Sequence, residues 1–437
     1  MNHDKAGGKF TSSLGFVLAA VGSAVGMGNI WLFPYRIGQY GGGAFLIPYF
    51  LFVALFSYVG LTGEFALGRL TGTGAMGSLD YVLRQKGKRG GKLLGVIPLL
   101  GVLGIAIGYS VVVGWVLRYT AGSVTGSILN GDAQGFFNAL AVDFGSVPWH
   151  LAAVVVTVVI LVLGVAGGIE RLSKVMMPAF FLLFLVIAIR VAFLPGAAEG
   201  YRYLLQPDWS RLLDPETWVM AMGQAFFSLS INGAGMLIYG SYMEKNESIL
   251  RHAGMTAVLD TLAALLAGFA IIPAVFAFGI DPTSGPALMF VTLPQVFEQM
   301  PGGRVFAVFF FLSVVFAGIT SLMNMLEACG EALNSTLGLS RRLSLLTVGV
   351  VTFGAGLFVE SLSGMGGWMD LITIYVSPFG ALLVAVCLYF VLGPDEVRDE
   401  LALGGRRPGP AFNRLARFYV LVAGAVWALG IYYQGIG

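Results

Sequence analysis

Two clusters of small and polar residues interrupt long apolar runs. The first reads Gly22-Ser-Ala-Val-Gly26-Met-Gly28-Asn29, and the second reads Ser228-Leu-Ser230-Ile-Asn232-Gly233-Ala-Gly235. Hydroxyls, amide oxygens and free backbone carbonyls are ligands for a cation or for the charged ends of a zwitterion. Inside a bilayer, unpaired backbone groups are tolerated only where they line a cavity or are buried in protein. Each cluster therefore predicts an unwound helix that binds something, and close helix packing through Gly22 and Gly26 is the alternative.

Three acidic residues, Glu64, Asp260 and Glu327, also lie within apolar runs. Ionisable groups at such depth are energetically expensive and are usually paired or functional. The three histidines lack the spacing of metal ligands, and the chain has no zinc-protease, nucleophile-elbow or nucleotide-loop motif. These residues indicate a binding site in a membrane and not an enzyme.

The composition sets the class of protein that must position these residues. Of 437 residues, 57% are hydrophobic and 11% are charged, and the mean hydropathy is +0.84. Soluble domains carry about 25% charged residues, so a soluble enzyme and a disordered chain are excluded. A net charge of +2 offers no footprint for nucleic acid, and Cys329 and Cys387 lie in apolar runs that predict no disulfide framework. The chain is an integral membrane protein.

The apolar runs have the length of membrane-spanning helices, which is about 20 residues. Eleven are predicted, at 13–37, 43–68, 93–122, 150–166, 172–194, 217–243, 250–279, 303–334, 343–360, 368–392 and 413–434. The alternating short segments of a membrane β-barrel are absent from the sequence. We therefore expect an all-α membrane protein that forms a single transmembrane domain over residues 1–437 and contacts the lipid bilayer.

Basic residues predict the orientation of these spans. Lys5 and Lys9 precede the first span, a basic cluster lies at 84–92, and the connection 123–149 has no Lys or Arg. The positive-inside rule then places the N-terminus in the cytoplasm and, with eleven spans, the C-terminus outside.

The motifs resemble one family across most of the chain. SAVGMGNIWLFPY followed by GGGAFLIPY resembles the first two spans of the neurotransmitter:sodium symporter family, which has the LeuT fold. GQAFFSLS and IYGSY resemble its sixth span, LDTLAALLAGFAIIPAVFAFG its seventh and FAGITSLMNMLE its eighth, in order from about residue 10 to residue 392. The resemblance implies two inverted five-helix repeats at 13–194 and 217–392 and an extra span at 413–434. Spans 1 and 6 would be unwound mid-membrane, as the equivalent clusters suggest.

The resemblance implies sodium-coupled import of a neutral amino acid by alternating access, in a bacterial inner membrane and with two sodium ions. The first ion would be held by the Ala24 carbonyl, Asn29, Ser228, Asp260 and the substrate carboxylate. The second would be held by the carbonyls of Gly22, Val25 and Ala317 and by the hydroxyls of Thr320 and Ser321. Hydroxyls bonded to their own helix are the alternative for Thr320 and Ser321.

The substrate site follows from the same resemblance. The carboxylate would meet the amides near Ala24 and Gly26 and the Tyr109 hydroxyl, and the ammonium would meet carbonyls around Phe227 and Ser230. The side chain would be surrounded by Ile105, Phe227, Ile231, Gly233, Ser321 and Met325. Because relatives often place a bulky residue at the position of Gly233, we expect a large neutral substrate, with aromatic ones included. The alternative is that Gly233 only permits a sharper unwinding.

The predicted gates and the chloride site depart from the family pattern. Leu32 stands where the family has an arginine, so Arg36, one helical turn further on, and Asp370 are the candidates for an outer gate. The alternative is an Arg36 that snorkels to the interface. The usual inner pair would fall near Gly7 and Ser335 and is absent from the sequence, which leaves Lys5 or Lys9 as a substitute. Transport is expected to need no chloride, because Ala264 replaces a chloride-contacting serine and the Asp260 carboxylate can supply the negative charge.

Two other functions stay open at this point. The altered gates are compatible with an amino-acid sensor of the same fold that binds without transporting, and a proton-coupled transporter is the other alternative. The sequence predicts a small-molecule partner and no nucleic acid, and it specifies no oligomeric state.

Overall fold

The structure is a computed structural model that describes residues 8–279 and 288–434. The first half of the chain forms α1 (Ser13–Ala24), η1 (Gly28–Leu32), α2 (Phe33–Gln39), α3 (Leu46–Leu55), η2 (Phe56–Leu61), α4 (Thr62–Thr71), α5 (Ala75–Arg84), α6 (Gly91–Thr125), α7 (Ala133–Leu140), α8 (Val147–Val162), η3 (Val165–Glu170) and α9 (Arg171–Ala192). These helices contain the first five expected spans.

The second half forms α10 (Ala197–Leu205), η4 (Trp209–Leu213), α11 (Pro215–Ser228), α12 (Gly235–Ser241), α13 (Ile249–Ala277), η5 (Leu288–Thr292), α14 (Leu293–Gln299), α15 (Gly303–Leu337), α16 (Arg341–Gly356), η6 (Leu357–Val359), α17 (Leu362–Asp370), η7 (Leu371–Val376), α18 (Ser377–Val386), η8 (Cys387–Leu392), α19 (Pro394–Ala402) and α20 (Ala411–Tyr432). Within the described ranges the only β pairing is an isolated bridge between Gly42 and Pro207.

Each of the eleven expected spans overlaps at least one of these helices. Eight helices in the described residues are long and apolar enough to cross a membrane, and α1 with η1 and α2 makes a ninth that is bent by 59°. The fourth span is α8, which has 16 residues, and the sixth is divided between α11 and α12. The chain is a multi-pass membrane protein.

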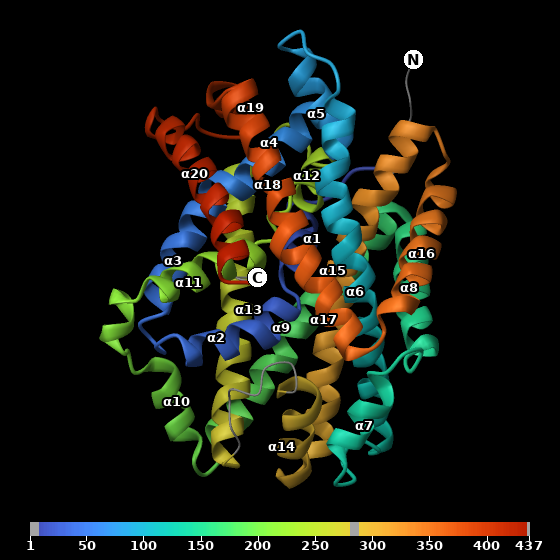
Figure 1. Cartoon of the computed structure of the whole chain (residues 1–437), viewed down its shortest axis with the longest axis vertical. Coiled ribbons are helices and arrows are strands. Elements are labelled where there is room, and N and C mark those ends of the chain that lie inside the picture. The colour runs from blue at the N-terminus through green and yellow to red at the C-terminus, as the bar shows by residue number, and fades with distance from the viewer. Residues whose placement is uncertain (1–7, 280–287, 435–437) are drawn as a thin grey trace.

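The two longest helices, α6 and α15, form the spine of the molecule. Each has 35 residues, and they pack against each other along the long axis in Figure 1. At 1.5 Å per residue such a helix is roughly 50 Å long, which exceeds a hydrocarbon layer of about 30 Å. Both helices therefore reach beyond the membrane, and α1 packs against α15 in the interior.

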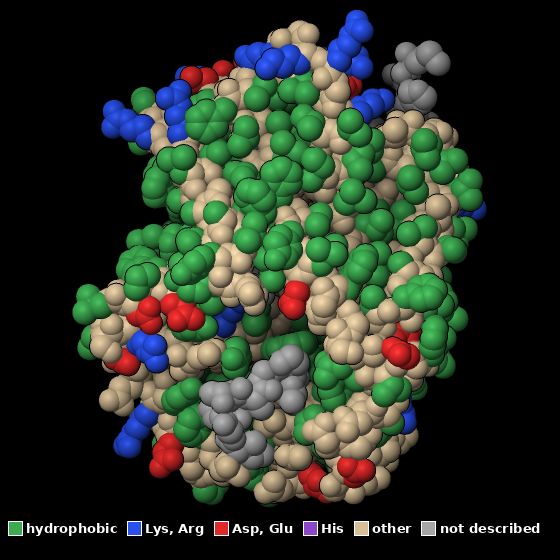
Figure 2. All heavy atoms as spheres, in the orientation of Figure 1, with side chains coloured by type: hydrophobic (Ala, Val, Ile, Leu, Met, Phe, Trp, Pro, Cys, Tyr) green, Lys and Arg blue, Asp and Glu red, His purple; other side chains and the backbone are tan. Residues whose placement is uncertain are grey.

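The surface distinguishes the two ends of the molecule. Hydrophobic side chains cover the middle, and Lys and Arg side chains gather at the end where α5 and α19 lie (Figure 2). We call this the basic end; the opposite end carries α7, α10 and α14. The exposed residues Lys86, Lys88 and Arg89 follow α5 at the basic end. By the positive-inside rule this is the predicted cytoplasmic side.

Candidate functional site

Two helix breaks meet in the interior of the protein. α1 ends at Ala24, and Val25 is extended, with φ −68° and ψ 112°. In the second break, between α11 and α12, Ser230 has φ 51°, a left-handed conformation that a residue with a Cβ rarely adopts. The Ser230 hydroxyl donates to the Ser23 carbonyl across 2.9 Å, so the breaks are joined directly. Strained backbone of this kind concentrates at functional sites.

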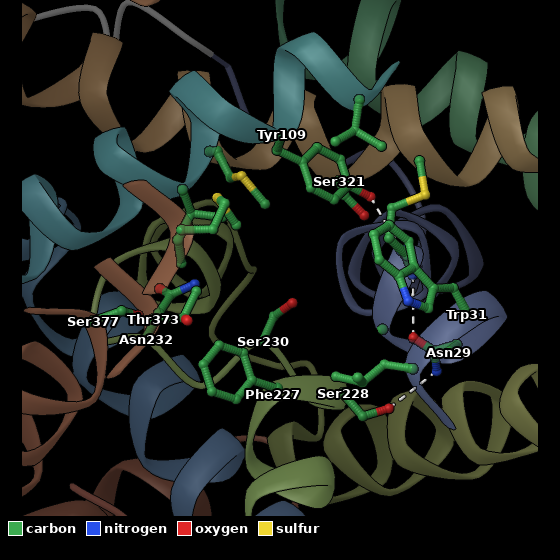
Figure 3. Close-up of a pocket in the computed structure, with 18 of the residues that line it drawn as sticks. Asn29, Trp31, Tyr109, Phe227, Ser228, Ser230, Asn232, Ser321, Thr373 and Ser377 are labelled. Atoms are coloured by element: carbon green, nitrogen blue, oxygen red, sulfur yellow. Dashed lines mark hydrogen bonds between the residues drawn. The ribbon is translucent and has the colours of Figure 1, made fainter. Parts of the chain in front are cut away.

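The breaks form one wall of a cavity of about 350 Å³. Helices α6, α15, α17 and η7 supply much of the remainder (Figure 3). The cavity extends away from the basic end, toward Phe137 of α7 and Phe290 of η5, and Figure 2 shows a hollow in the lower half of this face. A ligand would therefore enter from the end opposite the basic one.

A carboxylate and its two partners lie beside the cavity, buried between α11, α13 and η1. Asn29 Nδ2 donates to Asp260 Oδ1 across 2.8 Å and to Ser228 Oγ across 3.0 Å. Ser228 Oγ lies 2.6 Å from Asp260 Oδ2. The three residues predicted for the first sodium ion are thus brought together, and Ala24, the fourth, lines the cavity nearby. Their oxygens suit a hard cation.

A second group of oxygens gathers where α1 ends against α15. The Ser321 hydroxyl lies 3.1 Å from the Gly22 carbonyl, 3.3 Å from the Ser23 carbonyl and 3.0 Å from the Val25 carbonyl. A Cβ on Gly22 would lie 2.8 Å from Thr320 Cβ, so glycine is needed for this approach. Three carbonyls that converge on one hydroxyl form an electronegative pocket, at the place expected for the second ion.

Thr320 itself bonds to its own helix. Its hydroxyl donates to the carbonyls of Phe316, at 2.8 Å, and Ala317, at 3.1 Å. This is the alternative weighed for Thr320 from the sequence, and the hydroxyl oxygen keeps acceptor capacity toward a cation. The Ala317 carbonyl, another ligand predicted for the second ion, thus accepts a hydrogen bond from Thr320.

Tyr109 closes the cavity near the first break. Its hydroxyl accepts from the Met27 amide across 3.4 Å, and a Cβ on Gly26 would lie 2.8 Å from the same oxygen. The Gly26 amide donates to Asn29 Oδ1 across 3.2 Å. A phenol and backbone amides at the end of a helical segment are suited to a carboxylate.

The cavity is lined by nine of the ten residues expected around the substrate. They are Ala24, Gly26, Ile105, Tyr109, Phe227, Ser230, Ile231, Ser321 and Met325. The tenth, Gly233, does not line the cavity. Its φ is +79°, and a Cβ there would lie 3.0 Å from the Gly380 carbonyl and 2.8 Å from Val384 Cγ2. The inference that Gly233 leaves space for a large side chain is therefore wrong; the left-handed turn is its role.

Sequence reasoning missed several cavity residues. Trp31 lines the cavity near Asn29, and Asn232, Thr373 and Ser377 line it on another side (Figure 3). Thr373 and Ser377 are four residues apart in an apolar span, a helical spacing that places both on one face. This spacing is the feature of the sequence that could have identified Thr373 and Ser377 as cavity residues.

The expected outer gate is not formed. Arg36 is 5% exposed and donates to Gln224 across 3.1 Å, with no carboxylate of the described residues within 4.0 Å of its guanidinium. Asp370 is exposed and lines the cavity. The snorkelling alternative also fails, because Arg36 is buried. The Gln224 amide, held in turn by the Gly28 carbonyl at 3.2 Å, is the partner that the sequence did not indicate.

The basic end is closed by contacts of the segment that precedes α1. Lys9 forms an ion pair of 2.9 Å with Glu244, and its role as a substitute for the missing arginine stays a prediction. Glu170 of η3 accepts from the Thr11 amide at 2.6 Å and from the Ser12 hydroxyl at 2.7 Å. Ser12 caps α1, so Glu170 fixes the position where this helix begins.

The other two intramembrane acids have polar partners. Glu64 Oε1 accepts from the Gly233 amide across 2.8 Å, which stabilises the second break. Glu327 accepts from Arg341 Nη1 at 2.6 Å and from the Tyr242 hydroxyl at 2.6 Å. No group of three His, Cys, Asp or Glu side chains that could hold a transition metal occurs in the described residues.

Comparisons with known proteins agree on one family. The model of the sodium:neurotransmitter symporter family matches residues 7–139 and 134–418. The chain is 37% identical over 421 residues to an uncharacterized sodium-dependent transporter, YhdH, of Bacillus subtilis strain 168, with 92% of each chain covered. It is 33% identical over 423 residues to another from Haemophilus influenzae, covering 90% of this chain and 91% of that one. The crystal structure of MhsT in complex with L-phenylalanine matches with a TM-score of 0.87 at 31% identity, covering 97% of this chain and 99% of that chain.

Proposed function

The chain belongs to the sodium:neurotransmitter symporter family, and from this premise we propose that it imports a large neutral amino acid together with two sodium ions. The observation that carries the proposal is the position of the two oxygen groups. One surrounds Asp260 and the other surrounds Ser321, and both are built on the first helix break, which also lines the cavity. An ion at either group would order the backbone that the substrate contacts.

The first ion would join η1, α11 and α13. Asn29, Ser228 and Asp260 supply one ligand each, and the Ala24 carbonyl would complete the site with the substrate carboxylate. A ligand shared between ion and substrate makes the two affinities mutually dependent, and this coupling free energy is reciprocal. The second ion would join the end of α1 to α15 through Gly22, Val25, Ala317, Thr320 and Ser321.

The substrate would bind with its carboxylate toward Tyr109 and Gly26 and with its ammonium toward carbonyls near Phe227 and Ser230. The side chain of the substrate would find apolar contacts with Ile105, Phe227, Ile231 and Met325. Met325 is flexible enough to adapt to side chains of different shape. MhsT has L-phenylalanine bound, and this supports an aromatic substrate for the present chain.

The two ends of the molecule differ in the way that alternating access requires, because the cavity extends toward one end and the other end is closed. The cavity extends toward α7 and η5, whereas the basic end is closed by Lys9, Glu170 and their partners. With the basic end in the cytoplasm, this arrangement corresponds to substrate entry from outside. Loss of the second ion would release α1 from α15 and allow the cytoplasmic side to open.

Purified protein in sealed liposomes tests the proposal. An inward sodium gradient should drive uptake of a radiolabelled aromatic amino acid, and an equal potassium gradient should not. Sodium-dependent binding without uptake would support the sensor, and uptake driven by a proton gradient in the absence of sodium would support a proton-coupled transporter. Either result would overturn sodium symport.

A further inference from the structure

One wall of the cavity is polar, whereas most of the residues predicted to surround the substrate side chain are apolar. Asn232 of the second break, Thr373 of η7 and Ser377 at the start of α18 all line the cavity. Asn232 is 9% exposed and Ser377 is 3% exposed, so this wall is deep inside the protein. The polar atoms of these three side chains are accessible from the cavity, so a bound ligand can form hydrogen bonds with them.

The partners of these groups are incomplete among the described residues. Asn232 Oδ1 accepts from the amides of Ala234, at 3.1 Å, and Gly235, at 2.8 Å, which leaves its Nδ2 group as a free donor. Neither the Thr373 hydroxyl nor the Ser377 hydroxyl forms a hydrogen bond within the described ranges. Helical hydroxyls elsewhere bond to their own backbone, as Thr157 does to the Ala153 carbonyl at 2.8 Å.

The local backbone keeps Thr373 and Ser377 on the cavity side. Thr373 lies within the π-helical turn η7, and Ser377 follows that turn directly. Single π-turns inside helices are frequent at functional sites because they rotate the side chains that follow. Gly101 lets α6 approach this position, since a Cβ there would lie 2.9 Å from the Ser377 Cα.

The polar wall lies across the cavity from the groups expected to hold the substrate backbone. In Figure 3, Asn232, Thr373 and Ser377 stand on one side, and Tyr109, Ser321 and Asn29 stand on the other. Phe227 lies in the lower half of the view close to Asn232, and Ser230 stands near the middle. An amino acid held by its carboxylate near Tyr109 would pass its side chain along Phe227 toward the polar wall.

We propose that Asn232, Thr373 and Ser377 form a subsite for a hydrogen-bonding group at the far end of an aromatic side chain. The ligand class is the phenol of tyrosine and the indole N–H of tryptophan. The two hydroxyls can donate or accept, and Asn232 Nδ2 donates, so either group finds a complement. This inference rests on the proposed amino-acid transport and narrows its substrate from large neutral residues to those with a polar aromatic end.

The subsite should separate tyrosine from phenylalanine. A site built to hydrogen-bond a hydroxyl disfavours the analogue that lacks it, because the polar groups of the site are then left without a partner. Binding of tyrosine should therefore be at least about tenfold tighter than binding of phenylalanine or leucine, the effect of one hydrogen bond in a buried pocket.

The experiment is sodium-dependent binding of tyrosine, tryptophan, phenylalanine and leucine to the full chain in detergent. In the double variant Thr373→Val with Ser377→Ala, the tyrosine-to-phenylalanine ratio should fall to roughly one through loss of tyrosine affinity. Phenylalanine affinity should change less than about threefold, which also reports that the variant is folded. Thr347→Val on α16, whose hydroxyl bonds to the Leu343 carbonyl outside the cavity, is the matched control and should keep the wild-type ratio.

The outcomes separate the two proposals. Equal affinity of the wild-type protein for tyrosine and phenylalanine, or a preference for leucine, overturns the subsite and leaves amino-acid transport standing. A preference that survives in the double variant also overturns it. Failure of the wild-type protein to bind any amino acid in sodium overturns the proposed function itself.

Discussion

The side-chain amide of Asn29 donates to the Asp260 carboxylate across 2.8 Å, and both residues are fully buried. The oxygen of the same amide accepts from the Gly26 backbone across 3.2 Å. To ligate a sodium ion beside Asp260, Asn29 must turn this oxygen away from Gly26. The Gly26 amide is then free for the substrate carboxylate, so one rotation would link the ion to the substrate.

Asp260→Asn should weaken sodium binding at least about tenfold, because the variant keeps the shape of the site and removes the one carboxylate that the predicted protein ligands supply. Sodium titration of substrate binding measures the change. Thr157→Val, in a helix away from the cavity, is the control and should leave the sodium affinity unchanged. An unchanged sodium affinity in Asp260→Asn would exclude this carboxylate as a ligand.

Asn29→Ala should lower the sodium affinity and also make substrate binding less dependent on sodium. The reason is that the variant leaves the Gly26 amide permanently free for the substrate carboxylate. Sodium binding then has a smaller effect on the substrate affinity. Substrate affinity measured in sodium and in potassium gives the coupling ratio, which should approach one. A ratio equal to that of the wild-type protein would show that Asn29 does not transmit the coupling.

Thr320→Val tests the second ion. Valine has nearly the shape of threonine, and it fills the space opposite Gly22 while it removes one oxygen from the group around Ser321. We expect sodium-driven uptake to need several-fold more sodium. If the hydroxyl serves only its own helix, to which it donates through the Phe316 carbonyl, uptake should keep the wild-type sodium dependence.

Replacement of chloride by gluconate should leave uptake within about twofold of its value in chloride, because Asp260 already places a negative charge beside the first sodium site. By the family resemblance, Tyr49, Gln224 and Ser228 match chloride-contacting positions. Two of them have other partners here, since Ser228 bonds to Asp260 and Gln224 bonds to Arg36 and to the Gly28 carbonyl. Loss of uptake in gluconate would contradict this reading of Asp260.

The sequence predicted the helices and the family well, because long apolar runs and short motifs depend on local information. The LeuT-type fold is confirmed, and so is the family. The breaks at Gly26 and Gly233 were also readable, because small residues are combined there with hydroxyl and amide side chains in mid-span. Which oxygens serve as ligands stays a prediction.

What the sequence could not supply was the pairing of distant side chains. Arg36 was matched to Asp370 because it lies one helical turn beyond the position of the family's gate arginine, but its hydrogen-bond partner in the fold is Gln224. Gly233 was read as empty space at the cavity, although its Cα faces Gly380 on α18. Both errors concern contacts between helices far apart in the chain, and no periodicity within one span reports them.

Glu170 holds the segment before α1 at the basic end, which is the predicted cytoplasmic side. Glu170 is 1% exposed and accepts hydrogen bonds from the Thr11 amide, the Thr11 and Ser12 hydroxyls and Lys174 Nζ. Gly15 has no Cβ, and this allows the carboxylate to lie against the first turn of α1. A negative charge at this position also favours the N-terminus of the helix.

Glu170→Gln should therefore loosen the start of α1 and favour the state that is open to the cytoplasm. The amide has one acceptor oxygen in place of two and turns a donor toward the donors of Thr11 and Ser12, which should cost about 1–3 kcal/mol of stability. We expect a lower melting temperature and weaker binding of sodium and substrate from the outside of sealed, outward-oriented vesicles. Lys174→Met, which removes one partly exposed contact and leaves the other three, should have a smaller effect on both quantities. If Glu170→Gln lowers the melting temperature but leaves both affinities unchanged, Glu170 stabilises the fold without holding the cytoplasmic side closed.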